Sequence, residues 1–179
     1  KLNQISQNIP TARGLGSSAS CIVSGIMIAN DVLNNILSKD EVFQIASELE
    51  GHPDNVGASI YGGMIVGIHN DRESTLVSLP IGDVEAIVTI PPFELNTERA
   101  REVLPTHLSH SQAVSSSAAA NILVAAAATN DWKLVGEMME RDNFHEKYRS
   151  ELMPHYSRIK RLAKEEGAYG SSISGAGPT

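Results

Sequence analysis

Residues 9–20, IPTARGLGSSAS, combine small residues with hydroxyl side chains directly before a long apolar run. Gly14 and Gly16 would let a ligand approach the main chain closely, and Ser17 and Ser18 add hydroxyl oxygens. At the start of a helix, free backbone N–H groups and the helix dipole together attract phosphate. The stretch therefore predicts a phosphate cradle that works mainly through main-chain N–H groups.

Other interpretations fit this stretch less well. A Walker-type loop requires Gly-Lys-Ser/Thr, but no lysine lies between Lys1 and Lys39. A dinucleotide fingerprint requires a second parallel strand after the helix, whereas a second helix is predicted there. A plain capping turn stays open, although Pro10 and the doubled serine exceed what capping needs. For Arg13, beside the turn, a solvated role fits the sequence as well as a phosphate contact does.

A second polar cluster occupies residues 50–55, which include Glu50, His52, Asp54 and Asn55. A zinc site is disfavoured because no second His or Cys lies at a ligand spacing. Asp54 and Asn55 both favour helix starts, so capping is the alternative for them. For Glu50 the alternative is a solvated carboxylate at a helix end.

The elements that would position these residues follow from periodicity and turn chemistry. Ser17 is a candidate cap for the first helix, Ser38 and Glu41 form a capping-box pattern for the second, and Pro53 can open a third. Helices are predicted over 17–37, 39–50, from 53, and near 97–104, 109–129, 131–141 and 152–166. Strands are predicted over 2–9, 62–70, 74–79, 84–91 and 167–174, with a turn at 70–73.

This order of strand, helices, strands, helices and strand indicates an α+β fold rather than regular βαβ alternation. Near residues 91–96 the predicted elements change from strands to a series of helices, so we expect one domain over 1–92 and a second over 93–179. The chain does not begin with Met and stops within a glycine-rich loop. We therefore expect an internal piece of a longer protein.

Composition narrows the classes of function. The 179 residues are 41% hydrophobic and 20% charged, with a formal net charge of −7, which disfavours nonspecific nucleic-acid binding and anionic membrane surfaces. The single cysteine, Cys21, excludes an internal disulfide and fits a reducing cytoplasmic compartment, where it would pack as a small hydrophobe. No apolar run reaches the length of a membrane span, and no signal peptide is visible.

Five segments resemble one known family, the GHMP kinases. PTARGLGSSAS at 10–20 matches the Pro-x-x-x-Gly-Leu-Gly-Ser-Ser-Ala signature of that family, and SGAGPT at 174–179 is similar to its third signature. Within the family, the segments 49–55, 98–105 and 148–156 resemble the homoserine kinases. The resemblance implies a ribosomal-protein-S5-like N-terminal domain and a ferredoxin-like C-terminal domain, here truncated at both ends.

The same resemblance implies an activity. ATP would phosphorylate the side-chain hydroxyl of L-homoserine with Mg²⁺, giving O-phospho-L-homoserine for threonine biosynthesis. Another small-molecule kinase of the family, such as a mevalonate kinase, and a non-catalytic nucleotide-binding module remain alternatives. The sequence does not decide the oligomeric state, for which a homodimer is one candidate.

Site residues are likewise implied by matching positions. Ser18 and Glu50 would be catalytic and hold the metal. Asn55 would bind the amino acid, Arg101 and Arg149 its carboxylate, and Asp54, favoured over Asp142, its ammonium group. ATP would contact Pro10, Thr11, Ala12, Arg13, Gly14, Leu15, Gly16, Ser17, Ser18, Ala19 and Ser20. The substrate would contact His52, Asp54, Asn55, Arg101, Arg149 and Gly175.

Two departures from the family pattern affect these expectations. Residues 56–59 read Val-Gly-Ala-Ser where Val-Ala-Pro-Ala is usual, and Ala176 replaces a common serine. The first departure loosens the local helix, and the second removes a hydroxyl while leaving the backbone donors. No side chain is identified as a general base, so we expect the proton to pass to the phosphate itself.

Overall fold

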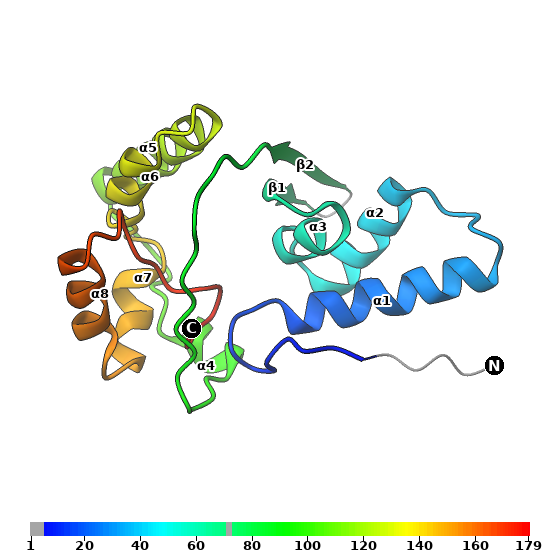
Figure 1. The fold of residues 1–179 in the computed structure, drawn as a ribbon, viewed down its shortest axis with the longest axis horizontal. Coiled ribbons are helices and arrows are strands. Elements are labelled where there is room, and N and C mark those ends of the chain that lie inside the picture. The colour runs from blue at the N-terminus through cyan, green and yellow to red at the C-terminus, as the bar shows by residue number, and fades with distance from the viewer. Residues whose placement is uncertain (1–5, 71–72) are drawn as a thin grey trace.

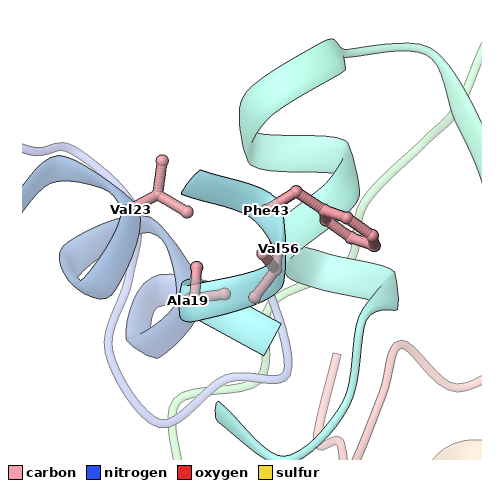
Figure 2. Packing of buried hydrophobic residues seen from close by; sticks show 5 residues of the cluster. Ala19, Val23, Phe43 and Val56 are labelled. Atoms are coloured by element: carbon pink, nitrogen blue, oxygen red, sulfur yellow. The ribbon is translucent and has the colours of Figure 1, made fainter. Parts of the chain in front are cut away.

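The computed structural model describes residues 6–70 and 73–179, and its first half builds three helices and a hairpin around one core. This core is formed by the side chains of Ala19, Val23, Phe43, Ala46 and Val56. Figure 2 labels all of these residues except Ala46. Because these residues come from all three helices, the core fixes the helices against one another. Their bounds are α1 Ser17–Val32, α2 Lys39–Glu50 and α3 Asp54–Tyr61.

The capping box predicted for α2 is confirmed. Ser38 Oγ accepts the backbone N–H of Glu41 at 3.2 Å, and Glu41 Oε2 accepts the backbone N–H of Ser38 at 2.8 Å. These bonds satisfy N–H groups that a helix start otherwise leaves without partners. Lys39 is therefore the first residue of α2, as predicted.

The first helix ends at Val32, five residues before the predicted end. Asn34 and Asn35 adopt left-handed backbone angles, with φ of 61° and 57°, which a continuing α-helix does not allow. The buried Asn30 side chain closes the following loop by accepting the N–H of Leu37 at 2.8 Å and donating to its carbonyl at 3.0 Å. The apolar pattern continued past the helix because these loop residues include Leu33, Ile36 and Leu37.

The predicted hairpin is confirmed as β1 (Met64–His69) paired antiparallel with β2 (Ser74–Leu79). Gln44 of α2 fastens its edge: its amide donates to the Ser74 carbonyl at 2.7 Å and accepts the Ser74 N–H at 2.8 Å. The predicted turn at 70–73 includes residues 71–72, which lie outside the described residues. The hairpin is thereby held against α2, which also packs against α1 in the core.

Three other predicted strands are wrong in the part of the chain that the structure describes. Residues 6–9, 84–91 and 167–174 form no strand, and residues 2–5 lie outside the described residues. A β-branched pattern needs a neighbouring strand for its hydrogen bonds, and the described sheet contains β1 and β2 alone. Ile87, within the expected strand at 84–91, is instead 93% exposed.

The second half is helical, in agreement with the helices predicted from residue 97 onward. Ala126, Ala127 and Val135 form its core, where the helix His110–Ala128 packs against the helix Trp132–Met139. The elements are α4 Thr97–Glu102, α5 His110–Ala128, α6 Trp132–Met139, α7 Glu146–Arg149, a 3₁₀ turn Ser150–Leu152 and α8 Tyr156–Glu165.

The helix predicted over 152–166 begins only at Tyr156, and α7 was not predicted at all. Met153 is extended because it precedes Pro154, which disfavours the helical conformation. The start of α7 is stabilised by Asp142, whose carboxylate accepts the backbone N–H of Phe144 at 2.7 Å and that of Glu146 at 3.0 Å.

The two halves are joined by the irregular segment 80–96, and the last residues return to the start of α1 (Figure 1). Near its start the segment is tied to the α5–α6 turn, because the Gly82 N–H donates to Asn130 Oδ1 at 3.1 Å. At the return, Ser174 Oγ donates to the Gly14 carbonyl at 2.7 Å. The mixed helix-and-strand prediction is confirmed, and none of the described helices has the length and apolarity to cross a membrane.

Candidate functional site

Residues 10–16, called the phosphate loop here for their predicted role, lead directly into α1. Gly14 and Gly16 both have a φ of 74°, in the left-handed region that glycine adopts without strain. Gly16 rather than Ser17 takes the N-cap position, so no N-cap side chain covers the first N–H groups of α1. Ser17 and Ser18 lie in the first helical turn. The first N–H groups of α1 are therefore available to donate hydrogen bonds to a phosphate group.

Ser18 and Glu50, the residues expected to hold a metal, lie together. Ser18 Oγ donates to Glu50 Oε2 at 2.8 Å, and the Glu50 side chain is only 11% exposed. Ser18 is in the first turn of α1 and Glu50 ends α2, so the core between those helices sets this pair. One carboxylate and one hydroxyl form the small set of oxygen ligands that suits Mg²⁺ bound to nucleotide phosphates.

The polar residues after Glu50 form a connected set. His52 Nδ1 lies 2.7 Å from Asp54 Oδ1, and His52 Nε2 lies 3.9 Å from Glu50 Oε1. Asp54 Oδ1 also accepts the Asn55 N–H at 2.8 Å, and the Asn55 side chain lies beside Gly16. No cluster of three or more His, Cys, Asp or Glu side chains suited to a metal occurs among the described residues. The cluster therefore adjoins the start of α1 through Asn55.

The glycine loop, residues 174–177, packs against the phosphate loop through backbone atoms. The hydroxyl of Ser174 donates to the Gly14 carbonyl, and within the glycine loop the Gly177 N–H donates to the Ser174 carbonyl at 2.9 Å. A Cβ atom on Gly14 would overlap the Ser174 carbonyl oxygen. Glycine is thus required at position 14 both by its φ and by the closeness of the two loops.

Arg149 lies where α4, α7 and the glycine loop meet. Its Nε donates to the Ala100 carbonyl at 3.2 Å and its Nη1 to the Gly175 carbonyl at 2.7 Å. Burial lowers the pKa of Arg149, the nearby Asp142 carboxylate opposes this shift, and the charge of Arg101 lowers the pKa further. Two guanidinium groups are therefore close enough to repel each other, which an anion bound beside them would offset.

The charged residues near Arg149 differ in their partners. Arg101 is exposed and has no ion pair with any residue in 6–70 or 73–179, whereas Arg99 pairs with Glu102 at 3.7 Å. Burial alone would raise the pKa of Asp142, but contacts with the His145 ring and with three backbone N–H groups hold it well below its usual range. Both of its oxygens are thus engaged locally, whereas the local bonds of the exposed Asp54 are to Oδ1.

Sequence reasoning missed two contacts of the phosphate loop. Arg13 Nη1 pairs with Glu94 at 3.5 Å and donates to the Ala12 carbonyl at 3.4 Å, so it is directed toward the connecting segment. Ser174, which bonds to Gly14, belongs to the motif SGAGPT but is not among the predicted site residues. Its place directly before Gly175 in the motif was the signal available for it.

Comparisons with known proteins agree with these features. The family model for the GHMP kinases N terminal domain matches residues 3–63, and that for GHMP kinases C terminal matches residues 123–179. A protein of Staphylococcus aureus strain JH9 named homoserine kinase is 49% identical over 178 residues, covering 98% of this chain and 59% of that protein. A crystal structure of homoserine kinase from Cytophaga hutchinsonii matches with a TM-score of 0.82 and 32% identity, covering 96% of this chain and 56% of that one. The chain thus spans less than two thirds of the length of these relatives.

Proposed function

The chain belongs to the GHMP kinase family, and from that premise we propose that it transfers the terminal phosphoryl group of ATP to the side-chain hydroxyl of L-homoserine. The observation that carries the proposal is the bond between Ser18 and Glu50 at the helix start that follows the phosphate loop. The names of the relatives support homoserine as the acceptor. The product would be O-phospho-L-homoserine, an intermediate for threonine biosynthesis in the cytoplasm.

ATP would bind with its phosphates on residues 10–20, which comprise the phosphate loop and the first residues of α1. The main-chain N–H groups after Gly14 and Gly16 would donate to phosphate oxygens, and the dipole of α1 would favour their negative charge. Mg²⁺ would be held by Ser18 and Glu50 and would neutralise charge on the transferring phosphoryl group. The hard oxygen donors of this pair support magnesium over a softer metal.

L-homoserine would bind between the polar cluster and the arginines. Its carboxylate would lie on Arg101 and Arg149, whose mutual repulsion it would offset. Its ammonium group would face Asp54, because that carboxylate is 66% exposed and its local bonds are to Oδ1. In Asp142, by contrast, both oxygens accept backbone N–H groups. His52, Asn55 and Gly175 would complete the wall around the acceptor.

The phosphoryl transfer itself would depend on positioning and charge neutralisation. No side chain of the cluster is assigned as the base, and the hydroxyl proton would pass to the transferred phosphate. We place the domain boundary near residue 92, within the connecting segment 80–96. The acceptor would then lie between residues supplied by both halves.

A coupled ADP-release assay tests the proposal by comparing homoserine, mevalonate, galactose and no acceptor. We expect ADP release that depends on homoserine and on Mg²⁺. Release that depends instead on mevalonate would favour another kinase of the family, and Asp54→Asn should then be harmless because mevalonate lacks an ammonium group. ATP binding by calorimetry without turnover on any acceptor would favour a nucleotide-binding module.

A further inference from the structure

We infer that Arg149 is a positioning residue for the phosphate loop, acting through the glycine loop, in addition to any contact with the acceptor. This inference rests on the proposed function, because it assumes that residues 10–20 bind nucleotide phosphates. The structural basis is a pair of side-chain-to-backbone hydrogen bonds, from Arg149 to the Gly175 carbonyl and from Ser174 to the Gly14 carbonyl.

The first step is the attachment of Arg149 to two separate segments. Its Nε and Nη1 donate to the carbonyls of Ala100 in α4 and Gly175 in the glycine loop. The Ala100 side chain is fully buried, which fixes that end of the attachment. A guanidinium is planar and presents its donors in a rigid fork, so fixing one donor also fixes the direction of the other. Arg149 thereby holds the Gly175 carbonyl at a set place.

The second step is the contact of the glycine loop with the phosphate loop. Ser174 Oγ donates to the Gly14 carbonyl at 2.7 Å, and a Cβ on Gly175 would lie only 3.3 Å from that same oxygen. Gly14, in turn, could not carry a Cβ without meeting the Ser174 carbonyl. Because backbone rests on backbone here, a displacement of Gly175 would displace Gly14. The donors after Gly14 would then move from their phosphate-binding positions.

Two roles for Arg149 therefore make different predictions. If Arg149 only binds the acceptor carboxylate, its loss weakens homoserine binding and leaves nucleotide binding unchanged. If it positions the glycine loop, its loss weakens nucleotide binding even when no acceptor is present. We expect Arg149→Met to weaken the binding of MgADP about tenfold, the change typical of losing one hydrogen bond from a charged donor.

The experiment is isothermal titration of MgADP, without homoserine, into the wild type, Arg149→Met, Arg101→Met and Arg99→Met. Arg101→Met is the matched control, because Arg101 is a neighbouring candidate for the acceptor carboxylate but has no described bond to the glycine loop. We expect both controls to keep the wild-type affinity for MgADP. Equal affinity in the wild type and Arg149→Met would overturn the inference, as would an equal loss in Arg101→Met.

Ser174→Ala tests the second step without altering Arg149. It should also weaken MgADP binding, and the double variant with Arg149→Met should lose less than the sum of the two single losses, because both act through one loop. Unchanged binding in Ser174→Ala would contradict the inference even if Arg149→Met failed to fold. Where both variants fold, strictly additive losses would contradict it as well. A wild type that binds no MgADP would instead count against the proposed function.

Discussion

Ser18 Oγ and Glu50 Oε2 are 2.8 Å apart although 32 positions separate the two residues in the chain. The core of Ala19, Phe43 and Ala46 brings the start of α1 to the end of α2 and so produces this approach. A neutral and an anionic oxygen thus meet beside the helix start that would receive phosphate. Both the identity of the pair and its position can be tested by substitution.

Glu50→Gln keeps the shape of the side chain and an oxygen that can accept from Ser18, but removes the charge. We expect kcat for ADP release to fall by about 100-fold, since charge stabilisation in the transition state is lost, and the Mg²⁺ requirement to rise. The rate measured across a Mg²⁺ titration checks this. Glu48→Gln, an exposed acid on the same helix, should behave as the wild type. A similar loss in both variants would argue for a nonspecific effect of charge.

Gly14→Ala should abolish the close packing of the two loops. Its φ of +74° strains any side chain, and the added methyl group would meet the Ser174 carbonyl. We expect a loss of about 1–3 kcal/mol in the free energy of unfolding, together with weaker MgADP binding. Chemical denaturation and calorimetry measure the two effects.

Gly25→Ala is the matched control, because a Cβ at this position of α1 has no atom within 4 Å. We expect it to stabilise the protein by about 0.5–1 kcal/mol, the usual gain in a helix interior. Stability lost equally at both positions would mean that loop contacts do not explain the effect at Gly14.

Gln44→Ala should loosen the hairpin from α2. It removes both bonds to the Ser74 backbone and leaves a part-buried N–H and carbonyl without these partners, which is expected to lower the free energy of unfolding by about 1–3 kcal/mol. Gln44→Glu retains an acceptor for the N–H but loses the donor, so an intermediate loss is expected. Urea denaturation measures both losses. Unchanged midpoints would contradict a stabilising role for the two bonds from Gln44 to the Ser74 backbone.

The pH dependence of stability should carry a contribution from Tyr61. Burial, and then the hydrogen bond and negative charge of Asp40, raise the pKa of Tyr61 from 10.0 to about 12. A raised pKa in the folded state means that this contribution is complete below pH 10 and is lost as the pH rises from about 10 to about 12. Tyr61→Phe should flatten the stability curve in that range, whereas Tyr169→Phe, at an exposed site, should not.

The local signals of the sequence predicted the elements that depend on neighbouring residues. The capping box of Ser38 and Glu41, the helix opened after Pro53 and the hairpin from Met64 to Leu79 all formed. Residues 84–91 and 167–174 did not form strands, because a strand depends on hydrogen-bond partners that may come from anywhere in a chain. A period-2 pattern carries no information on whether such a partner lies alongside.

The features of the site likewise separate into those that the sequence could predict and those that it could not. The family signature drew attention to the loop that precedes α1, and the structure places Ser18 Oγ 2.8 Å from Glu50 Oε2, while the role of the two residues as metal ligands stays a prediction. The bonds from Arg149 to the carbonyls of Ala100 and Gly175 could not be predicted, because every residue has a carbonyl and none marks its acceptor in the sequence.

Ala19, the residue after Ser18, is fully buried in the core of the first half. The first turn of α1 is therefore held in place before any nucleotide arrives. The entropy of ordering the phosphate-binding donors is lost once, during folding, and is not lost again at each round of binding. A ligand would meet a surface already shaped for it, so any induced adjustment should be confined to side chains such as Arg13 rather than to the helix.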